Sequence, residues 1–379
     1  MPHALPLLLA SPERPRQTPG TTHPISAPPL PGAGPAWFPS VMGTGILAGL
    51  LQTHAHTIPG AHFLAPATLI ICWLLLLGLT LTFTLRCLTQ PGVLRAALTL
   101  PAQIPFWGTV SMGILSAGSS TTMVLPAHLP GSDTLAWQID TVTWTIGTII
   151  GVLSALYFGT RLVGPNLGDP TPVWGLAVVG PMVSATTGAL LAQHVPTQFA
   201  PYILMAALSC FFLALSLGLV IFAYAYQRHW RTAPIPLVAS ASSWIPLGLV
   251  GQSTAAVQAM AHTAAPMTSP EFAHALAHMA NVYGYVMFFV GTPLIAWATL
   301  VTLRGFQHRM PFTPGWWALT FPIGTLALGA TLLGRGTGYP AFTGCGVAAT
   351  VILIGTVTLC LVASAHAVTR AVLRPTSLS

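Results

Sequence analysis

Charged residues are scarce in this sequence. Asp, Glu, Lys and Arg make up 4% of the 379 residues, against about 25% in an ordinary soluble domain, and 53% of the residues are hydrophobic. Such a composition cannot supply the polar surface that a water-soluble globular domain needs. The sequence therefore predicts an integral membrane protein.

Lysine is absent, and the twelve basic residues are all arginine; with five acidic residues the net charge is +7. The arginines stand singly or in pairs between hydrophobic runs, which excludes a basic patch for nucleic acid. The five cysteines lie in or beside apolar segments and include no CxxC pair. Neither a zinc site nor a disulfide framework is therefore indicated.

Hydrophobic runs recur along the chain at the length that crosses a membrane, about 20 residues. Residues 1–35 contain ten prolines and no periodic pattern, which predicts a disordered cytoplasmic tail ahead of a membrane domain at 36–374. Within that domain we predict an all-α fold with ten transmembrane helices. They cover roughly residues 37–54, 63–85, 106–125, 137–160, 173–193, 198–226, 237–261, 271–303, 316–334 and 341–369.

Arginine positions give the predicted orientation. Eleven arginines fall before the first segment or after an even-numbered one, and only Arg335 falls on the other side. Cytoplasmic loops are enriched in arginine, so we expect both termini in the cytoplasm and a multi-pass protein of the plasma membrane. The ten segments then form five helical hairpins.

The odd-numbered segments share a pattern of bulky residues mixed with Gly, Ser or Thr. Even-numbered segments are smoother and richer in large apolar residues, which suits contact with lipid. Small-residue faces and freed carbonyls are tolerable only against protein or water, so we expect an inner ring of odd helices around a central pore and an outer ring of even helices. The alternative is that small residues merely permit close packing. The odd segments read WFPSVMGTGILA from 37, PFWGTVSMGILSA from 105, VVGPMVSATTGALLA from 178, SWIPLGLVGQSTAA from 243 and WWALTFPIGTLALGA from 316.

Equivalent positions in these five segments are 69, 73, 65 and 76 residues apart, one hairpin per period. A proline inside a helix removes a donor and clashes with a carbonyl one turn earlier, which bends the helix. We therefore expect breaks in the five inner helices. The predicted kinks are Pro39, Gly108, Pro181, Pro246 and Pro322.

Three stretches, WFPSVMGTGI at 37–46, FWGTVSMGI at 106–114 and WWALTFPIG at 316–324, resemble the tellurite-resistance/dicarboxylate transporter family. Plant slow-type anion channels and yeast malate and sulfite carriers are related to it. The resemblance, which extends over 36–374, implies a ten-helix pore protein with quasi-fivefold symmetry, often a homotrimer, that passes small inorganic or organic anions through the lipid bilayer. It also implies that Phe321 occludes the pore.

A kink at Pro322 would turn Phe321 toward the axis, where the ring would form an apolar constriction of the kind that gates channels. The alternative is that Phe321 only packs between helices. The odd segments contain no Asp, Glu, Arg or Lys, so an anion would meet hydroxyl groups and backbone dipoles. We predict that the pore lining includes Thr44, Thr109, Ser111, Ser184, Thr186 and Thr320.

Because no carboxylate is expected at mid-depth, channel-like passage is favoured over tight proton coupling. A proton-coupled C4-dicarboxylate or sulfite carrier of the same fold stays the alternative. An enzyme is not expected, since the histidines cluster at helix ends and no Ser/His, Asp/Asp or HExxH constellation occurs. For the same reason we expect no haem and no other cofactor. His274 and His278 are four residues apart on one helical face, a spacing that can hold a metal, and their protonation could make the outer mouth cationic. Because polar residues are ordinary at a membrane interface, we interpret them as interfacial residues and expect no metal.

Overall fold

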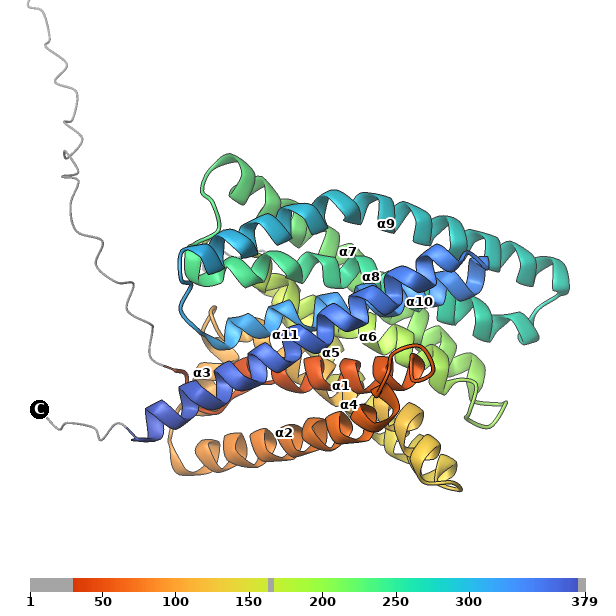
Figure 1. Ribbon diagram of the computed structural model, residues 1–379, viewed down its shortest axis with the longest axis horizontal. Helices are drawn as coiled ribbons and strands as arrows, with labels where there is room; N and C mark the ends of the chain where they lie inside the picture. Colours follow the sequence, from red (N-terminus) through yellow and green to blue (C-terminus); the bar gives the residue numbers. More distant parts are fainter. Residues whose placement is uncertain (1–29, 163–166, 374–379) are drawn as a thin grey trace, which may run out of the picture.

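The computed structural model of the chain describes residues 30–162 and 167–373, and within them all regular structure is helical, which confirms the predicted all-α class. Residues 1–29 of the predicted tail lie outside the described part, as do Arg14, Arg16 and Arg374. The α-helices (Figure 1) are α1 (Pro39–Thr53), α2 (Ala61–Thr89), α3 (Val93–Thr99), α4 (Trp107–His128), α5 (Asp133–Arg161), α6 (Leu176–Leu191), α7 (Ala200–Arg231), α8 (Ile245–Ala264), α9 (Pro270–Gln307), α10 (Phe321–Thr337) and α11 (Pro340–Leu373).

The long helices fall into two classes by burial. In the most apolar stretches of α6 and α10 with their preceding turns, 83% of residues are buried, against 22% in α2 and 17% in α9. Helices α1, α4 and α8 are likewise mostly buried. The exposed helices α2, α5, α7, α9 and α11 carry large apolar side chains on their outer faces, such as Phe63 and Phe289. Lipid is the natural solvent for such a surface.

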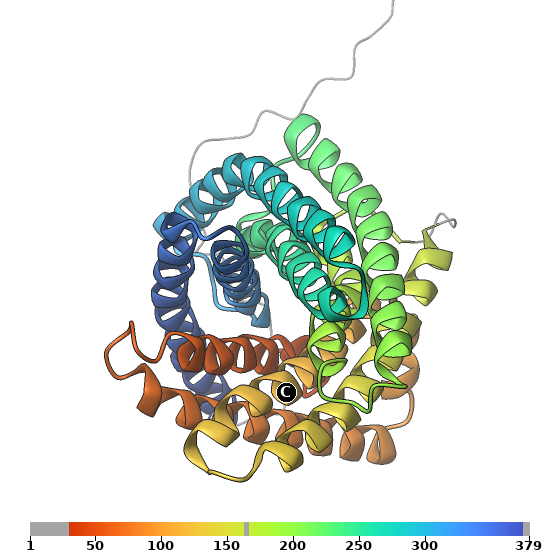
Figure 2. The same cartoon turned by 90° about the vertical axis from the view of Figure 1, so that its right-hand side faces the viewer.

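Contacts between the buried helices close a ring. α1 contacts α4, α4 contacts α6, α6 contacts α8, α8 contacts α10, and α10 contacts α1 again. Each buried helix also packs against the exposed helix that follows it in the chain, from α1 with α2 to α10 with α11. Seen end on, the exposed helices surround the buried ones (Figure 2).

A short 3₁₀ helix precedes each helix of the ring, at Pro35–Trp37, Ile104–Phe106, Pro172–Gly175, Leu237–Trp244 and Pro314–Leu319. Pro39, Pro246 and Pro322 therefore lie in the first turn of α1, α8 and α10. The N–H groups of a first turn have no acceptor within the helix, so a proline at that position breaks no helical hydrogen bond. The chain changes helix type ahead of these three prolines, and Pro181 lies inside α6.

Gly108 allows α4 and α6 to pack closely. It is the second residue of α4, and a β-carbon there would overlap the carbonyl oxygen of Leu176 at the start of α6. Backbones also meet between α8 and α10, where a β-carbon on Gly329 would lie 2.5 Å from the carbonyl oxygen of Gly251. Bare backbone at these points lets neighbouring ring helices approach each other.

Seven helical segments of the described chain are long and apolar enough to cross a membrane, which confirms a multi-pass membrane protein. α1, with 15 residues, is shorter than the about 20 that a span needs, and α4 and α8 are rich in small polar residues. The count of ten spans stays a prediction. The seven segments are Ala61–Thr89, Asp133–Arg161, Pro172–Leu191, Ala200–Arg231, Pro270–Gln307, Pro314–Thr337 and Pro340–Ala371.

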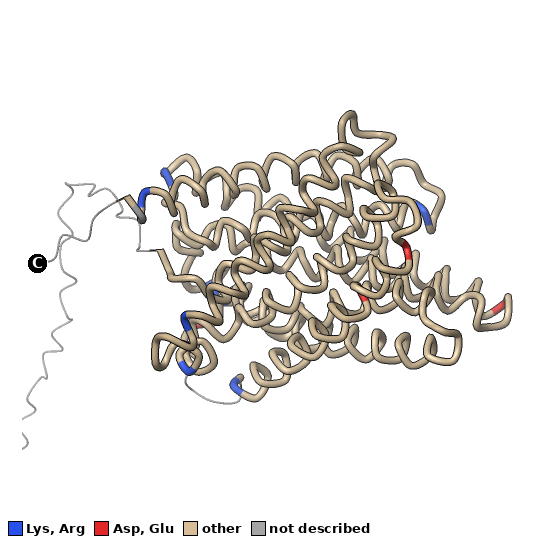
Figure 3. Tube along the Cα trace, turned by 90° about the horizontal axis from the view of Figure 1, so that it is seen from below, with Lys and Arg blue, Asp and Glu red and all other residues tan. Residues whose placement is uncertain are grey.

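Charged residues lie mainly at the two ends of the bundle, and the basic ones gather at one end (Figure 3). Arg228 and Asp169 form an ion pair of 2.6 Å, the only one among the described residues. Arg335, in the last turn of α10, has no acidic partner in the described part of the chain. A membrane around the middle of this bundle would meet an almost uncharged surface.

Candidate functional site

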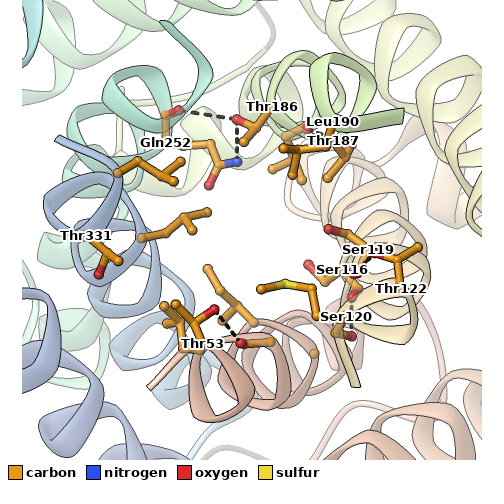
Figure 4. Close-up of a pocket in the computed structure, with 18 of the residues that line it drawn as sticks. Thr53, Ser116, Ser119, Ser120, Thr122, Thr186, Thr187, Leu190, Gln252 and Thr331 are labelled. Atoms are coloured by element: carbon orange, nitrogen blue, oxygen red, sulfur yellow. Dashed lines mark hydrogen bonds between the residues drawn. The ribbon is translucent and has the colours of Figure 1, made fainter. Parts of the chain in front are cut away.

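A cavity of about 280 Å³ lies inside the ring of buried helices. Side chains from around the ring point into it, and many of them are hydroxyl-bearing (Figure 4). Among the described residues, no acidic side chain lines this first cavity. Its polar lining comprises Thr53, Ser116, Ser119, Ser120, Thr122, Thr186, Thr187, His194, Gln252, Thr331 and Arg335.

Phe321 lies between the first cavity and a second one. It is the first residue of α10, separated from the preceding 3₁₀ segment by Thr320 alone, and is 3% exposed. The second cavity, of about 60 Å³, is mainly apolar and includes Met42, Met112 and Ile245. Of the described residues, only Phe321 lines both cavities. Its ring is therefore the element that the two cavities share.

The second cavity adjoins a third, of about 770 Å³, through shared residues that include Phe106 and Ser242. The third cavity is lined by residues 30–36 and by Arg86 near the end of α2. The first cavity, by contrast, extends along α10 to Arg335 in its last turn. The three cavities thus follow one another from the start of the ring helices to their ends.

Most hydroxyl groups in the first cavity are bonded to their own helix. Thr53, Ser120 and Thr187 donate to carbonyl oxygens one turn earlier, at 2.9, 2.6 and 2.9 Å. Such bonds leave only oxygen lone pairs for the cavity. Ser116 and Ser119 of α4 differ, since within the described residues their side chains make no hydrogen bond. Their hydroxyl hydrogens are available to whatever occupies the cavity.

Gln252 of α8 places an amide group at the wall of the first cavity and is 2% exposed. Its Nε2 donates to Oγ1 of Thr186, on α6, at 2.8 Å. Its Oε1 has no hydrogen-bond partner in the described part of the chain and lies on the cavity side in Figure 4. Leaving a buried acceptor without a partner costs about 1–3 kcal/mol, so this amide is suited to a further partner in the cavity.

Arg335 lines the end of the first cavity that is remote from Phe321, and His54 contacts Thr331, another residue of the lining. His54, which follows α1, is 4% exposed, and its Nε2 lies 3.2 Å from Oγ1 of Thr331. Because Thr331 donates its hydroxyl hydrogen to the carbonyl oxygen of Ala327, the imidazole must be the donor in this contact. Burial, and then the charge of Arg335, lower the pKa of His54. At neutral pH the positive charge at this end is therefore that of Arg335.

Of the six hydroxyl residues that were predicted to line a pore, one lines a cavity and five do not. Thr186 lines the first cavity. The other five donate to backbone carbonyls or are buried between helices, and they line none of these cavities: Thr44, Thr109, Ser111, Ser184 and Thr320. The polar lining lies further along the ring helices than the proline-containing turns. The hydroxyl run at 116–122 was the sequence signal for it, and Gln252 had no such signal.

Asp140 is a buried carboxyl group within the candidate span Asp133–Arg161, whereas no carboxylate was expected at mid-depth. It lies in α5, is 2% exposed, and has no partner for Oδ1 among the described residues. It packs behind Gly118 of α4, where a β-carbon would lie 2.9 Å from Oδ1. The ring helices thus carry no carboxylate of their own, but a titratable group is present directly behind one of them.

Comparison with known proteins identifies relatives that span most of the chain. The profile of the SLAC1 family, described as voltage-dependent anion channels, matches residues 32–365. A sulfite efflux pump, SSU1, of Trichophyton rubrum is 26% identical over 324 residues, covering 81% of this chain and 83% of the pump. The SSU1 pump of Candida albicans is 24% identical over 353 residues, covering 82% and 68%. An uncharacterized transporter, MJ0576, of Methanocaldococcus jannaschii is 24% identical over 309 residues, covering 79% and 83%.

Proposed function

The chain belongs to the SLAC1 family of voltage-dependent anion channels, and from this we propose that it passes small anions across a membrane through the cavities inside its helical ring, with Phe321 as the gate. The observation that carries the proposal is the position of Phe321 as the residue common to the first and second cavities. A single apolar ring at that point is a hydrophobic constriction, and such constrictions hold back ions by excluding water.

In this proposal the fold is ten transmembrane helices arranged as five hairpins. The five buried helices line the pathway, and the exposed helices face lipid. The arginine-rich end faces the cytoplasm, in keeping with the bias of cytoplasmic loops. The 3₁₀ segment ahead of Pro322 supports the gate, because the change of helix type at Thr320 sets the direction in which the next residue, Phe321, enters the bundle.

Anion preference in this proposal comes from what the pathway contains and from what it lacks. The first cavity has hydroxyl and amide groups and, among the described residues, no carboxylate. Arg335 adds one positive charge at its far end. Neutral donors bind a small anion weakly, which permits fast release and therefore conduction. Sulfite is the first substrate to test, because SSU1 relatives are described as sulfite efflux pumps.

The test is anion flux in liposomes that contain the parent protein or Phe321→Ala. Removing the ring joins the first and second cavities, and we expect the flux to rise about tenfold or more, which corresponds to a barrier lowered by about 1.4 kcal/mol. Phe158→Ala is the matched control, since Phe158 is equally buried in α5 and lines none of the three cavities. An unchanged flux in Phe321→Ala, with the protein correctly folded, would contradict the gate.

A second candidate function is proton-coupled efflux of sulfite or a dicarboxylate through the same fold. Buried Asp140 favours it, because a coupled carrier needs a titratable group within the membrane. If the protein is coupled, a pH gradient should drive substrate accumulation, and Asp140→Asn should abolish that drive while leaving passive flux in place. If the protein is a channel, flux should follow the electrochemical gradient of the anion alone in both proteins.

A further inference from the structure

The amide of Gln252 is poorly satisfied in the orientation described above. Its Nε2 donates to Thr186 Oγ1 at 2.8 Å, but the Thr186 hydroxyl hydrogen then has only two acceptors, the carbonyl oxygens of Met182 and Gln252, both at 3.4 Å. An O–H donor prefers about 2.7–2.8 Å. The Gln252 Oε1 meanwhile has no donor among the described residues. One good hydrogen bond thus leaves two groups without suitable partners.

Turning the amide by half a rotation satisfies both groups. Oε1 then occupies the position 2.8 Å from Thr186 Oγ1 and accepts the hydroxyl hydrogen of that residue. Oxygen and nitrogen of an amide are nearly the same size, so the rotation needs no change in packing. The NH₂ group then lies where Figure 4 shows the amide oxygen, on the cavity side. The result is a fixed pair of N–H donors at the cavity wall.

Further donors stand across the cavity from this amide. Ser116 and Ser119 of α4 line the opposite wall in Figure 4, and within the described residues their hydroxyl groups make no hydrogen bond. Donors on two facing walls, in a cavity whose described lining also contains the positive charge of Arg335 at its far end and no carboxylate, are suited to an anion. The volume of about 280 Å³ is several times the share of one water molecule, about 30 Å³, so a small anion enters with part of its hydration shell.

We infer that Gln252, Ser116 and Ser119 form a binding site for a small oxyanion, such as sulfite, in the first cavity; the inference rests on the proposed anion pathway and names the class of anion. An oxyanion has several acceptor oxygens for donors on opposite walls. In its hydrogen-bearing form it also donates to hydroxyl oxygens such as those of Ser120 and Thr187, whose hydrogens are used within their helices. A halide accepts hydrogen bonds but has no hydrogen to donate, so it leaves these oxygens without a partner.

The experiment compares sulfite and chloride fluxes in liposomes, with every variant made in the Phe321→Ala background so that the gate is absent. Gln252→Met keeps the length of the side chain and removes its N–H groups, and the sulfite-to-chloride flux ratio should fall about tenfold, as expected for the loss of hydrogen bonds to a charged group. Ser119→Ala, on the opposite wall, should lower the ratio several-fold. Gln258→Met is the matched control on the same helix, because its amide donates to Asn281 and lies outside the first cavity.

The outcomes separate this inference from the proposed function. Absence of any anion flux in the Phe321→Ala protein contradicts the pathway, and titration of sulfite into purified parent and Gln252→Met proteins by calorimetry then tests the site without transport. A weaker binding of about tenfold in Gln252→Met supports the site. An unchanged flux ratio and unchanged binding overturn the inference. So does an equal loss of sulfite and chloride flux in both Gln252→Met and Ser119→Ala, which would mean that these residues only maintain the shape of the cavity.

Discussion

Replacing Gly251 with alanine should destabilise the protein strongly, because α8 and α10 meet backbone to backbone at this point. A β-carbon on Gly251 would overlap backbone atoms of Thr325 and Leu326. The reciprocal contact is equally close, with a β-carbon on Gly329 only 2.5 Å from the Gly251 carbonyl oxygen. No side chain can rotate out of the way, so the two helices themselves must separate.

The size of the effect follows from this geometry. Adding a methyl group to a well-packed core typically costs about 1–3 kcal/mol, and because backbone cannot adapt, we expect Gly251→Ala to cost about 3 kcal/mol. Gly248→Ala is the matched control one turn earlier in α8, since the nearest atom to its β-carbon is Cγ of Pro322, at 3.9 Å. Alanine stabilises a helix interior by about 0.5–1 kcal/mol relative to glycine, so this control should be neutral or slightly stabilising.

Purified variants in mixed micelles can be unfolded by increasing amounts of a denaturing detergent, and circular dichroism then gives the free energy of unfolding. The transition of Gly251→Ala should come at a lower denaturant fraction than that of the parent, and the transition of Gly248→Ala should not. Equal stability of the two variants would refute the direct contact between α8 and α10, and with it the closed ring that places Phe321 beside the first cavity.

Two further predictions concern the end of the first cavity that is remote from Phe321. Burial and Arg335 lower the folded-state pKa of His54 below its ordinary value of 6.5, so the unfolded state binds more protons. The stability that neutral His54 contributes is therefore complete above about pH 6.5 and is lost as the pH falls toward the folded-state pKa. Unfolding measured across this range should show a decline below pH 6.5 that His54→Asn makes shallower. Arg335→Gln should lower anion flux from that side several-fold in dilute salt and much less at high ionic strength, since screening shortens the reach of a charge to about 3 Å at 1 M salt. An effect of equal size at both ionic strengths would exclude an electrostatic role.

The sequence alone determined the environment of this protein and most of its helices. A chain with 4% charged residues and repeated apolar runs has no stable fold in water except by burying those runs, so a helical membrane protein followed from composition and length. The pattern of small residues in alternate segments also separated the buried helices from the exposed ones, because only helices without lipid contact tolerate so many glycines and hydroxyls. Phe321 was predicted to occlude the pore from the neighbouring Pro322 and from a family resemblance.

Only the tertiary structure decided which side chains surround the cavities. A helix presents a different residue every 100 degrees or so, and whether Thr44 or Thr53 faces the interior depends on the rotation of α1 against its neighbours. That rotation is fixed by close contacts such as those at Gly108 and Gly251, which involve residues far apart in the chain. Gln252 illustrates the point most clearly. Nothing in its local sequence distinguishes it, and its amide matters only because α6 brings Thr186 to one side of it and the ring leaves a cavity on the other.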